Sequence, residues 1–249
     1  MLPLAWRVLR PGSGLWSHWQ RFGLLSLLGV GCYNALQYLA LKTSTPLNVT
    51  LVAASGPFWT LAIGALFFGV AARRAQLVGA LLSVSGVLVV LSRGDWLQLL
   101  QVRLVVGDLY ILVATACWSP YSWLLSRTLE PAGLRGQWAQ FLMAQVVFGL
   151  GWSGLFTAME WGLSDAHIVW GVPLLATLAF VAVGPAVLAY RCWGLGVQEA
   201  GPAMAGFFAN LTPVFAAILS AAFIGELPHL YHGLAFALIV AGIVASSRP

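Results

Sequence analysis

The sequence has few charged residues. Of its 249 residues only 8% are Asp, Glu, Lys or Arg, and just seven are acidic. A soluble globular protein carries about a quarter of its residues as charges, so a charged surface facing water is excluded. Because 60% of the residues are hydrophobic and the mean hydropathy is +0.89, we expect an integral membrane protein.

Cysteine is scarce and catalytic motifs are lacking. Cys32, Cys117 and Cys192 are odd in number, have no metal-ligand spacing and each lie in an apolar run, so we interpret them as small buried hydrophobic residues. His229 and His232 have no third ligand near them in sequence, which a metal site normally requires. The sequence also holds no His-Glu-x-x-His, Gly-x-Ser-x-Gly or Walker motif. We therefore expect no enzyme, no ATP-driven pump, no metal and no cofactor.

Apolar runs long enough to cross a bilayer are abundant. A transmembrane helix needs about 20 mostly apolar residues, and eight runs meet this requirement with only short connections between them. The predicted fold is therefore an all-α polytopic membrane protein with about eight transmembrane helices. These are expected at residues 22–41, 47–70, 75–92, 106–126, 137–158, 168–192, 203–224 and 231–247.

The basic residues predict the topology. Lys and Arg near helix ends are retained in the cytoplasm, and both termini are predicted to be cytoplasmic because their side holds eight basic residues against three. Residues 1–21 form a basic, Trp-rich lead-in without the apolar region of a signal peptide. Basic residues are scattered, so no nucleic-acid partner is expected. The eight are Arg7, Arg10, Arg21, Arg73, Arg74, Arg127, Arg135 and Arg248, and the three are Lys42, Arg93 and Arg103.

The chain repeats itself at an offset of 156 residues. Matched Pro and Gly residues carry the signal, because they interrupt helices and seldom coincide by chance. Five predicted helices separate the two copies, an odd number, so the second copy is inverted in the membrane, as in secondary transporters. The stretch 107–156 has no partner ahead of the first copy, so three helices are expected in one repeat and five in the other. The matched pairs are Pro46 with Pro202, Pro57 with Pro213, Gly69 with Gly225 and Gly86 with Gly242.

Three stretches resemble EamA-type members of the drug/metabolite transporter superfamily. Residues 201–226, from Gly-Pro-Ala-Met-Ala-Gly to Ile-Gly-Glu, are similar to that family's last helices. Gly107-Asp108 with Ala116-Cys-Trp-Ser-Pro-Tyr121 resembles the opening of its second repeat, and the stretch from Asn34 to Pro57 resembles its third and fourth helices.

The resemblance implies ten helices in two inverted repeats around a central cavity, with alternating access for small metabolites across the inner membrane. The chain is expected to lack the first two helices, and it has Val70 where the second repeat has Glu226. The predicted domains are a lead-in at 1–21, a truncated first repeat at 22–92 and a second repeat at 107–247. Without the first two helices one wall of the cavity is expected to be open, which makes a homo-oligomer a further expectation.

Polar and aromatic residues at the middle of the predicted helices are the candidates for the substrate cavity. Helical spacing groups them on single faces, and aromatic walls with a few hydrogen-bonding groups are typical of small-molecule sites. Each aromatic residue has packing as its alternative role, and Asn210 has interhelical bonding. The candidates are Asn34, Gln37, Tyr38, Trp118, Tyr121, Tyr190, Trp193 and Asn210.

Three further residues have two interpretations each. Pro57 and Pro213 predict kinks at matching depth, which either gate the transporter or are static. Arg191 is the one basic residue within a predicted helix, placed about one turn from its cytoplasmic end. It either extends its guanidinium to the membrane interface or contacts an anionic substrate.

The sequence therefore predicts a secondary transporter that exports small organic metabolites or drugs across the inner membrane. Its partners are a small-molecule substrate and the lipid bilayer. The alternative is a non-transporting membrane subunit or a shortened remnant of such a transporter. All seven acidic residues map to helix ends or loops, so no coupling ion is indicated.

Overall fold

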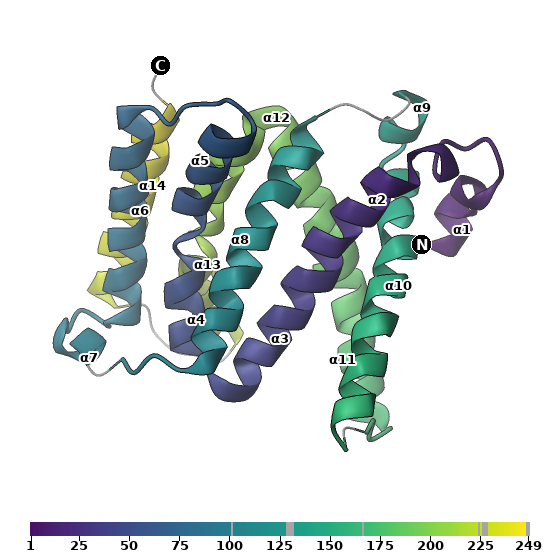
Figure 1. Cartoon of the computed structure of the whole chain (residues 1–249). Coiled ribbons are helices and arrows are strands. Elements are labelled where there is room, and N and C mark those ends of the chain that lie inside the picture. The colour runs from purple at the N-terminus through teal and green to yellow at the C-terminus, as the bar shows by residue number, and fades with distance from the viewer. Residues whose placement is uncertain (101, 128–131, 166, 224, 226–228, 248–249) are drawn as a thin grey trace. The chain divides into compact units, whose positions relative to one another are not determined.

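The computed structural model describes residues 1–249 except 101, 128–131, 166, 224, 226–228 and 248–249. Within the described residues every regular element is a helix (Figure 1). The prediction of an all-α polytopic membrane protein is therefore confirmed. Glu226, Arg248 and the last residue of the predicted helix 203–224 lie outside the described residues.

Each predicted transmembrane run contains helix. The first is α2 (Trp19–Ser26), η3 (Leu27–Cys32) and α3 (Tyr33–Thr43), and the second is α4 (Pro46–Ala53) and α5 (Gly56–Phe67). The other runs contain α6 (Arg74–Leu91), α8 (Val106–Ser126), α10 (Trp138–Leu163), α11 (Val172–Val183), η4 (Gly184–Ala189), α12 (Tyr190–Ala209), α13 (Thr212–Phe223) and α14 (Leu230–Ser247). Short elements complete the described chain: α1 (Leu2–Ala5), η1 (Trp6–Leu9), η2 (Trp16–His18), α7 (Leu97–Leu100) and α9 (Ala132–Arg135).

The number of continuous helices differs from the eight predicted runs. Among the described residues, six helical stretches are long and apolar enough to cross a membrane. The helix of residues 172–209 runs 38 residues, because η4 and α12 continue α11 beyond the predicted end at residue 192. The predicted helix 203–224 is divided, because the chain turns at residues 210–211 before the shorter α13 begins.

The chain forms two compact units, and neither coincides with a sequence repeat. Unit 1 consists of Met1–Ala35 with Leu124–Glu199, and unit 2 consists of Leu36–Trp123 with Ala200–Pro249. Each unit therefore combines pieces of both repeats. In unit 2 the offset of 156 maps residues 44–93 onto 200–249.

Glycines allow α6 and α14 to approach closely in unit 2. A Cβ atom on Gly79 would lie 2.5 Å from the carbonyl oxygen of Gly242, and one on Gly86 would lie 2.8 Å from that of Ala235. The two helices are antiparallel, since Gly79 meets the later residue and Gly86 the earlier one. The offset of 156 exchanges these two contacts, so the interface has the two-fold relation that inverted repeats require.

The matched Pro and Gly residues have matching structural roles. Pro46 begins α4, and Pro202 follows Gly201, where a φ of +83° kinks α12. Pro57 and Pro213 are each the second residue of a helix, α5 and α13. Gly69 and Gly225 both have positive φ, +68° and +81°, a left-handed conformation that glycine adopts without a steric cost and that often ends helices. Residues related by the offset of 156 therefore have similar backbone conformations in the two repeats.

In unit 1 the helix of residues 19–32 packs against α10. Gly31 and Gly149 allow the approach, with Gly31 facing Trp152 and Gly149 facing Val30. The Ser26 hydroxyl donates to the Gln145 carbonyl at 2.7 Å. Such contacts between small residues and polar groups hold membrane helices together, because lipid is as apolar as the side chains.

Arg21 joins α2 to the end of α8. Its guanidinium donates to the carbonyl oxygens of Leu124 at 2.9 Å and Arg127 at 2.5 Å. The last carbonyls of a helix have no partner within the helix and carry partial negative charge. A residue assigned from sequence to the cytoplasmic side thus also caps a transmembrane helix.

Candidate functional site

Asn34 and Tyr190 meet in the middle of unit 1. The Asn34 amide donates to the Tyr190 hydroxyl at 3.2 Å, and that hydroxyl donates to the carbonyl oxygen of Gly29. The two residues are 156 positions apart, so each bonds its own equivalent in the other repeat. A contact between equivalents lies on the two-fold axis that relates the repeats within this unit.

This contact lies beside two irregular helical segments. η3 and η4 are both π-helical, and the offset of 156 maps η4 onto residues 28–33, one residue from η3. Gly29 is within η3, and Tyr190 follows η4 directly. π-helical segments are rare and occur often at functional sites, so both repeats place a local irregularity at the same depth beside their shared contact.

The Tyr190→Phe variant is expected to have a free energy of unfolding about 1 kcal/mol lower, because the hydroxyl that accepts from Asn34 and donates to Gly29 is lost. Unfolding by a denaturing detergent, followed by circular dichroism, measures the change. Tyr38→Phe is the matched control, since Tyr38 is 56% exposed and its stability is expected to be unchanged. Equal stability of the two variants would contradict a role for the Tyr190 hydroxyl in holding unit 1.

Gln37 and Tyr38 lie on α3 and make fewer side-chain bonds than Asn34 and Tyr190. Gln37 is half-buried and Tyr38 is exposed. Among the described residues no protein group bonds the Gln37 amide, and Asn34 makes only its bond to Tyr190. Half-buried amide groups in a transmembrane helix therefore remain available to water or substrate.

The predicted aromatic candidates are half-buried or buried. Trp118 and Tyr121 lie on one side of α8 with ring centroids 4.9 Å apart. Tyr121 is 1% exposed, so its ring serves packing, whereas Trp118 is half-buried. Trp193 is half-buried on α12, one turn from Tyr190. Trp118 and Trp193 therefore retain part of their surface for a ligand.

Asn210 bonds across helices in unit 2. Its amide donates to the Ala54 carbonyl at 3.3 Å and to the Ser83 hydroxyl at 2.9 Å. Ala54 is again the equivalent of Asn210 at an offset of 156. The side chain is buried and both its donors are used, so the interhelical role is the one that the structure displays.

The prolines mark two breaks at equivalent places. The chain turns at residues 54–55 between α4 and α5 and at 210–211 between α12 and α13. Phe58, which would bond Ala54 in an unbroken helix, bonds Ser55 at 3.0 Å, so the Ala54 carbonyl is available to Asn210. Pro57 and Pro213 follow the breaks, so the predicted kinks are present, and their movement stays a prediction.

Arg191 is not near a helix end. The helix continues ten residues beyond it to the kink at Gly201, about 15 Å at the usual rise, so the predicted placement one turn from the end is wrong. The guanidinium lies 4.2 Å from the ring centroid of Trp138, the first residue of α10. Arg191 thus extends toward that end of α10 and forms a cation–π contact, in line with the interfacial alternative.

Asp108 has a structural role that its sequence pattern did not predict. Its carboxylate accepts from the Ser44 hydroxyl, from the Asn48 amide at 3.0 Å and from the Val105 backbone N–H at 2.8 Å. The neighbouring Gly107 has no room for a side chain, since a Cβ atom would lie 2.6 Å from the Ala40 carbonyl oxygen. The Gly-Asp pair therefore fastens the turn between α3 and α4 to the start of α8. The Gly107-Asp108 motif was the sequence signal for this role, although it served above only to support the family resemblance.

The cysteines differ in exposure. Cys32 and Cys117 are half-buried, and Cys192 is exposed. The prediction that all three are buried is therefore wrong. Cys192 lies on the transmembrane stretch of residues 172–209, whose most apolar window has no buried residue. A side chain exposed on such a stretch meets lipid, and a thiol is apolar enough to be accommodated there.

These features define a class of protein: a polytopic helical membrane protein with an inverted repeat, irregular helices at midspan and unpaired polar groups beside them. The EamA-like transporter family matches residues 1–92 and 105–248. The chain belongs to this family. It is accordingly a membrane-embedded transporter of small molecules and not an enzyme.

Relatives with transporter names cover most of the chain. It is 28% identical over 225 residues to the uncharacterized transporter YyaM of Bacillus subtilis, covering 90% of this chain and 72% of the relative. It is 26% identical over 240 residues to the aromatic amino acid exporter YddG of Ancylobacter novellus, covering 96% and 78%. The uncharacterized inner membrane transporter YedA of Escherichia coli is 27% identical over 236 residues, covering 89% and 68%.

The fold is also known from a solved structure. A crystal structure with 23% sequence identity matches with a TM-score of 0.65, covering 96% of this chain and 77% of that chain. The helical architecture is thus shared, and this identity carries no statement about substrate.

Proposed function

We propose that the protein is a secondary transporter that exports small organic metabolites by alternating access across the inner membrane, with both termini in the cytoplasm. The observation that carries this proposal is the amide chemistry of α3. Asn34 and Gln37 are half-buried at transmembrane depth, and the described part of the protein leaves the side-chain amide of Gln37 and the side-chain oxygen of Asn34 without partners. Unpaired amides facing lipid would be costly, so these groups face a watered path or a substrate.

The candidate residues favour neutral or zwitterionic aromatic solutes. Asn34 and Trp193 in unit 1, and Gln37 and Trp118 in unit 2, each offer an amide and indole surface and no ionised group, which suits stacking and hydrogen bonding. A relative is named as an aromatic amino acid exporter, which supports the same class for this chain. The E. coli relative is named as an inner membrane transporter, which supports the inner membrane as the location. The distribution of basic residues supports the cytoplasmic orientation of the termini.

Transport by the purified protein in proteoliposomes tests the proposal. Aromatic amino acids, nucleobases and amphiphilic drugs are loaded inside, and counterflow of each labelled solute is measured. We expect movement of at least one aromatic solute above that of empty liposomes. If the folded protein moves none of them, and a deletion strain exports metabolites normally, the proposal is wrong and a non-transporting membrane subunit is favoured.

Replacing Gln37 by Leu is expected to lower the transport rate at least about tenfold while the protein remains folded, because a hydrogen-bonding group of the path is lost. Asn34→Leu is expected to lower it as much. The control is Gln20→Leu, an exposed amide near the start of α2, which should transport normally. Normal transport by Gln37→Leu would exclude this side chain from the path.

A further inference from the structure

The lead-in is a folded part of unit 1. Ala5, Val8 and Leu15 are fully buried, and α1 and η1 lie against α10. The Trp16 ring meets Phe148 of α10 edge to face, with ring centroids 6.3 Å apart. The lead-in therefore presents a fixed outer surface.

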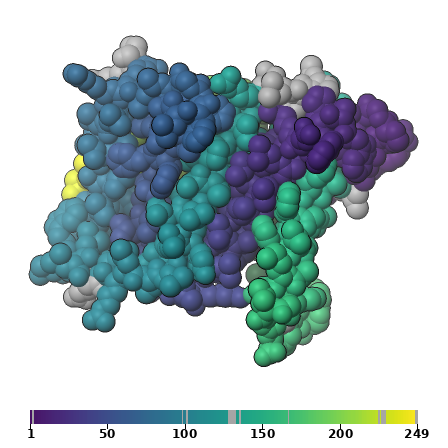
Figure 2. All heavy atoms as spheres, in the orientation of Figure 1, coloured from purple at the N-terminus to yellow at the C-terminus, as the bar shows by residue number. Residues whose placement is uncertain are grey.

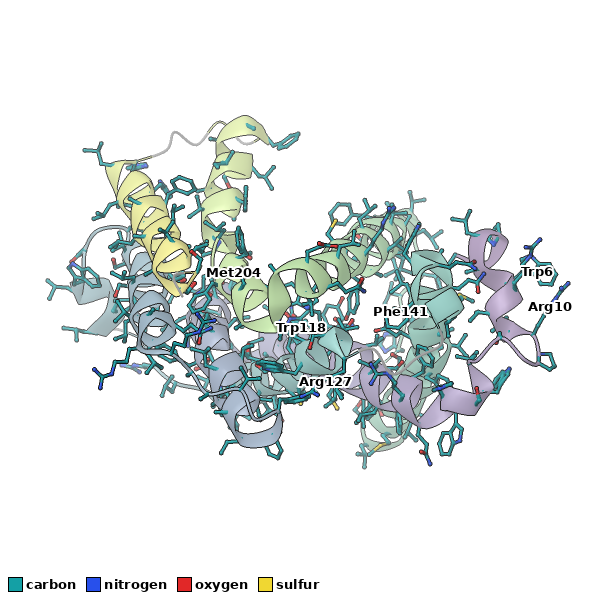
Figure 3. All side chains as sticks on the ribbon, turned by 90° about the horizontal axis from the view of Figure 1, so that it is seen from above. Trp6, Arg10, Trp118, Arg127, Phe141 and Met204 are labelled. Atoms are coloured by element: carbon teal, nitrogen blue, oxygen red, sulfur yellow. The ribbon has the colours of Figure 1, made fainter. Side chains whose placement is uncertain are left out.

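That outer surface combines indole rings with guanidinium groups. Trp6, Trp16 and Trp19 are 45%, 51% and 55% exposed, and Arg7 and Arg10 are exposed beside them. Figure 3 shows Trp6 and Arg10 projecting from the lead-in, and the Arg10 guanidinium lies 4.2 Å from the centre of the Trp6 ring. We call Leu4, Trp6, Arg7, Arg10, Trp16 and Trp19 the lead-in face. Figure 2 shows the N-terminal part of the chain, in purple, at the molecular surface.

Among the described residues, no acidic side chain contacts the positive charges of this face. The first 94 residues contain no Asp or Glu. Within the described residues, the Arg7 side chain has no bonding partner and the Arg10 side chain has only the Trp6 ring. The face therefore fits a partner that is negatively charged and also accepts exposed indoles.

The level of the lead-in identifies this partner. Arg21, its last residue, caps the carbonyls at the end of α8, so this end of the lead-in lies level with the end of a transmembrane helix. Indole rings favour the headgroup layer there, and guanidinium groups bind phosphate with two parallel hydrogen bonds. We propose that the lead-in face binds the headgroup of an anionic phospholipid in the leaflet on its own side of the membrane.

Lipid binding to the purified full-length protein tests this proposal. Native mass spectrometry measures the phosphatidylglycerol and phosphatidylcholine retained after titration with lipids of identical acyl chains. We expect a preference for phosphatidylglycerol that falls at least about tenfold in Arg7→Gln/Arg10→Gln, from the attraction of anionic lipid for each basic residue. It should also fall as salt rises, since salt screens exposed charges.

Arg93→Gln/Arg103→Gln is the matched control. Both arginines are exposed, Trp96 beside them is 55% exposed, and this region contains Asp95, an internal counter-charge. Its preference should stay within about twofold of the unchanged protein, and Arg7→Lys/Arg10→Lys, which retains the charge, should keep most of it. A salt-independent preference, or equal loss in the two Gln variants, overturns the proposal. Because no substrate is needed, the outcome is independent of the transport result.

Discussion

Gly79→Ala is expected to lower the free energy of unfolding by about 3 kcal/mol, the upper part of the range for overpacking a well-packed contact. The added Cβ atom would lie 2.5 Å from the Gly242 carbonyl oxygen and 2.9 Å from the Ser246 Cβ. The first of these is backbone, so α6 and α14 must separate. Unfolding in a denaturing detergent, followed by circular dichroism, measures the loss.

Gly233→Ala is the control for this prediction. Gly233 lies on α14, but nothing is within 4 Å of the position of its Cβ, and Ala favours helix over Gly by about 1 kcal/mol. This variant should be as stable as the unchanged protein or more so. Because Gly79 and Gly242 share one contact, the double Ala variant should lose less than the sum of the single losses. Additive losses would contradict the shared contact.

Asp108→Ala is expected to lower the free energy of unfolding by about 3 kcal/mol. Hydrogen bonds to a charged group contribute about 1.5–3 kcal/mol each, and this change leaves the Ser44 hydroxyl, the Asn48 amide and the Val105 N–H without their acceptor. The first turn of α8 also loses a negative charge that favours its N-terminus. The same unfolding measurement detects the loss.

The control is Asp165→Ala, an exposed acid whose side chain has no bond within the described residues. Its stability should be unchanged. Asp108→Asn retains an acceptor and should lose less than Asp108→Ala. If Asp108→Ala and Asp165→Ala unfold alike, the turn between α3 and α4 is held by other contacts.

The sequence predicted the helices well and their ends poorly. Apolar runs locate helices because lipid requires internally bonded backbone, and the matched Pro and Gly residues predicted the repeat from the sequence alone. Hydropathy does not show whether a helix continues past its apolar run, so α12 and with it Arg191 were misplaced. The break at residues 210–211 was signalled by Pro213, since Pro begins helices more readily than it continues them.

The candidate site was predicted in part. The offset of 156 paired Asn34 with Tyr190, and the structure joins them through a hydrogen bond. Whether a polar residue contacts another helix or a water-filled path depends on which faces of the helices pack together. The periodicity of a single helix does not contain that information. Asn210 lies where its helix meets its neighbours, so its amide bonds Ala54 and Ser83. Gln37 has the same amide chemistry, but its side chain has no partner in the described part of the protein.

Bonds between repeat equivalents restrict how the two halves of the chain can diverge. At 34 and 190 one bond joins the side chains of both copies of a position, so a substitution at either one alters it. At 54 and 210 the bond runs from the Asn210 side chain to the Ala54 backbone carbonyl, so only the side chain at 210 is restricted. Two identical residues could share a bond between their side chains, such as that of 34 and 190, only if each side chain both donates and accepts, as Asn does. Asn34 opposite Tyr190, and Ala54 opposite Asn210, make each bond unequal at its ends, so a backbone path that repeats carries different chemistry in its two copies.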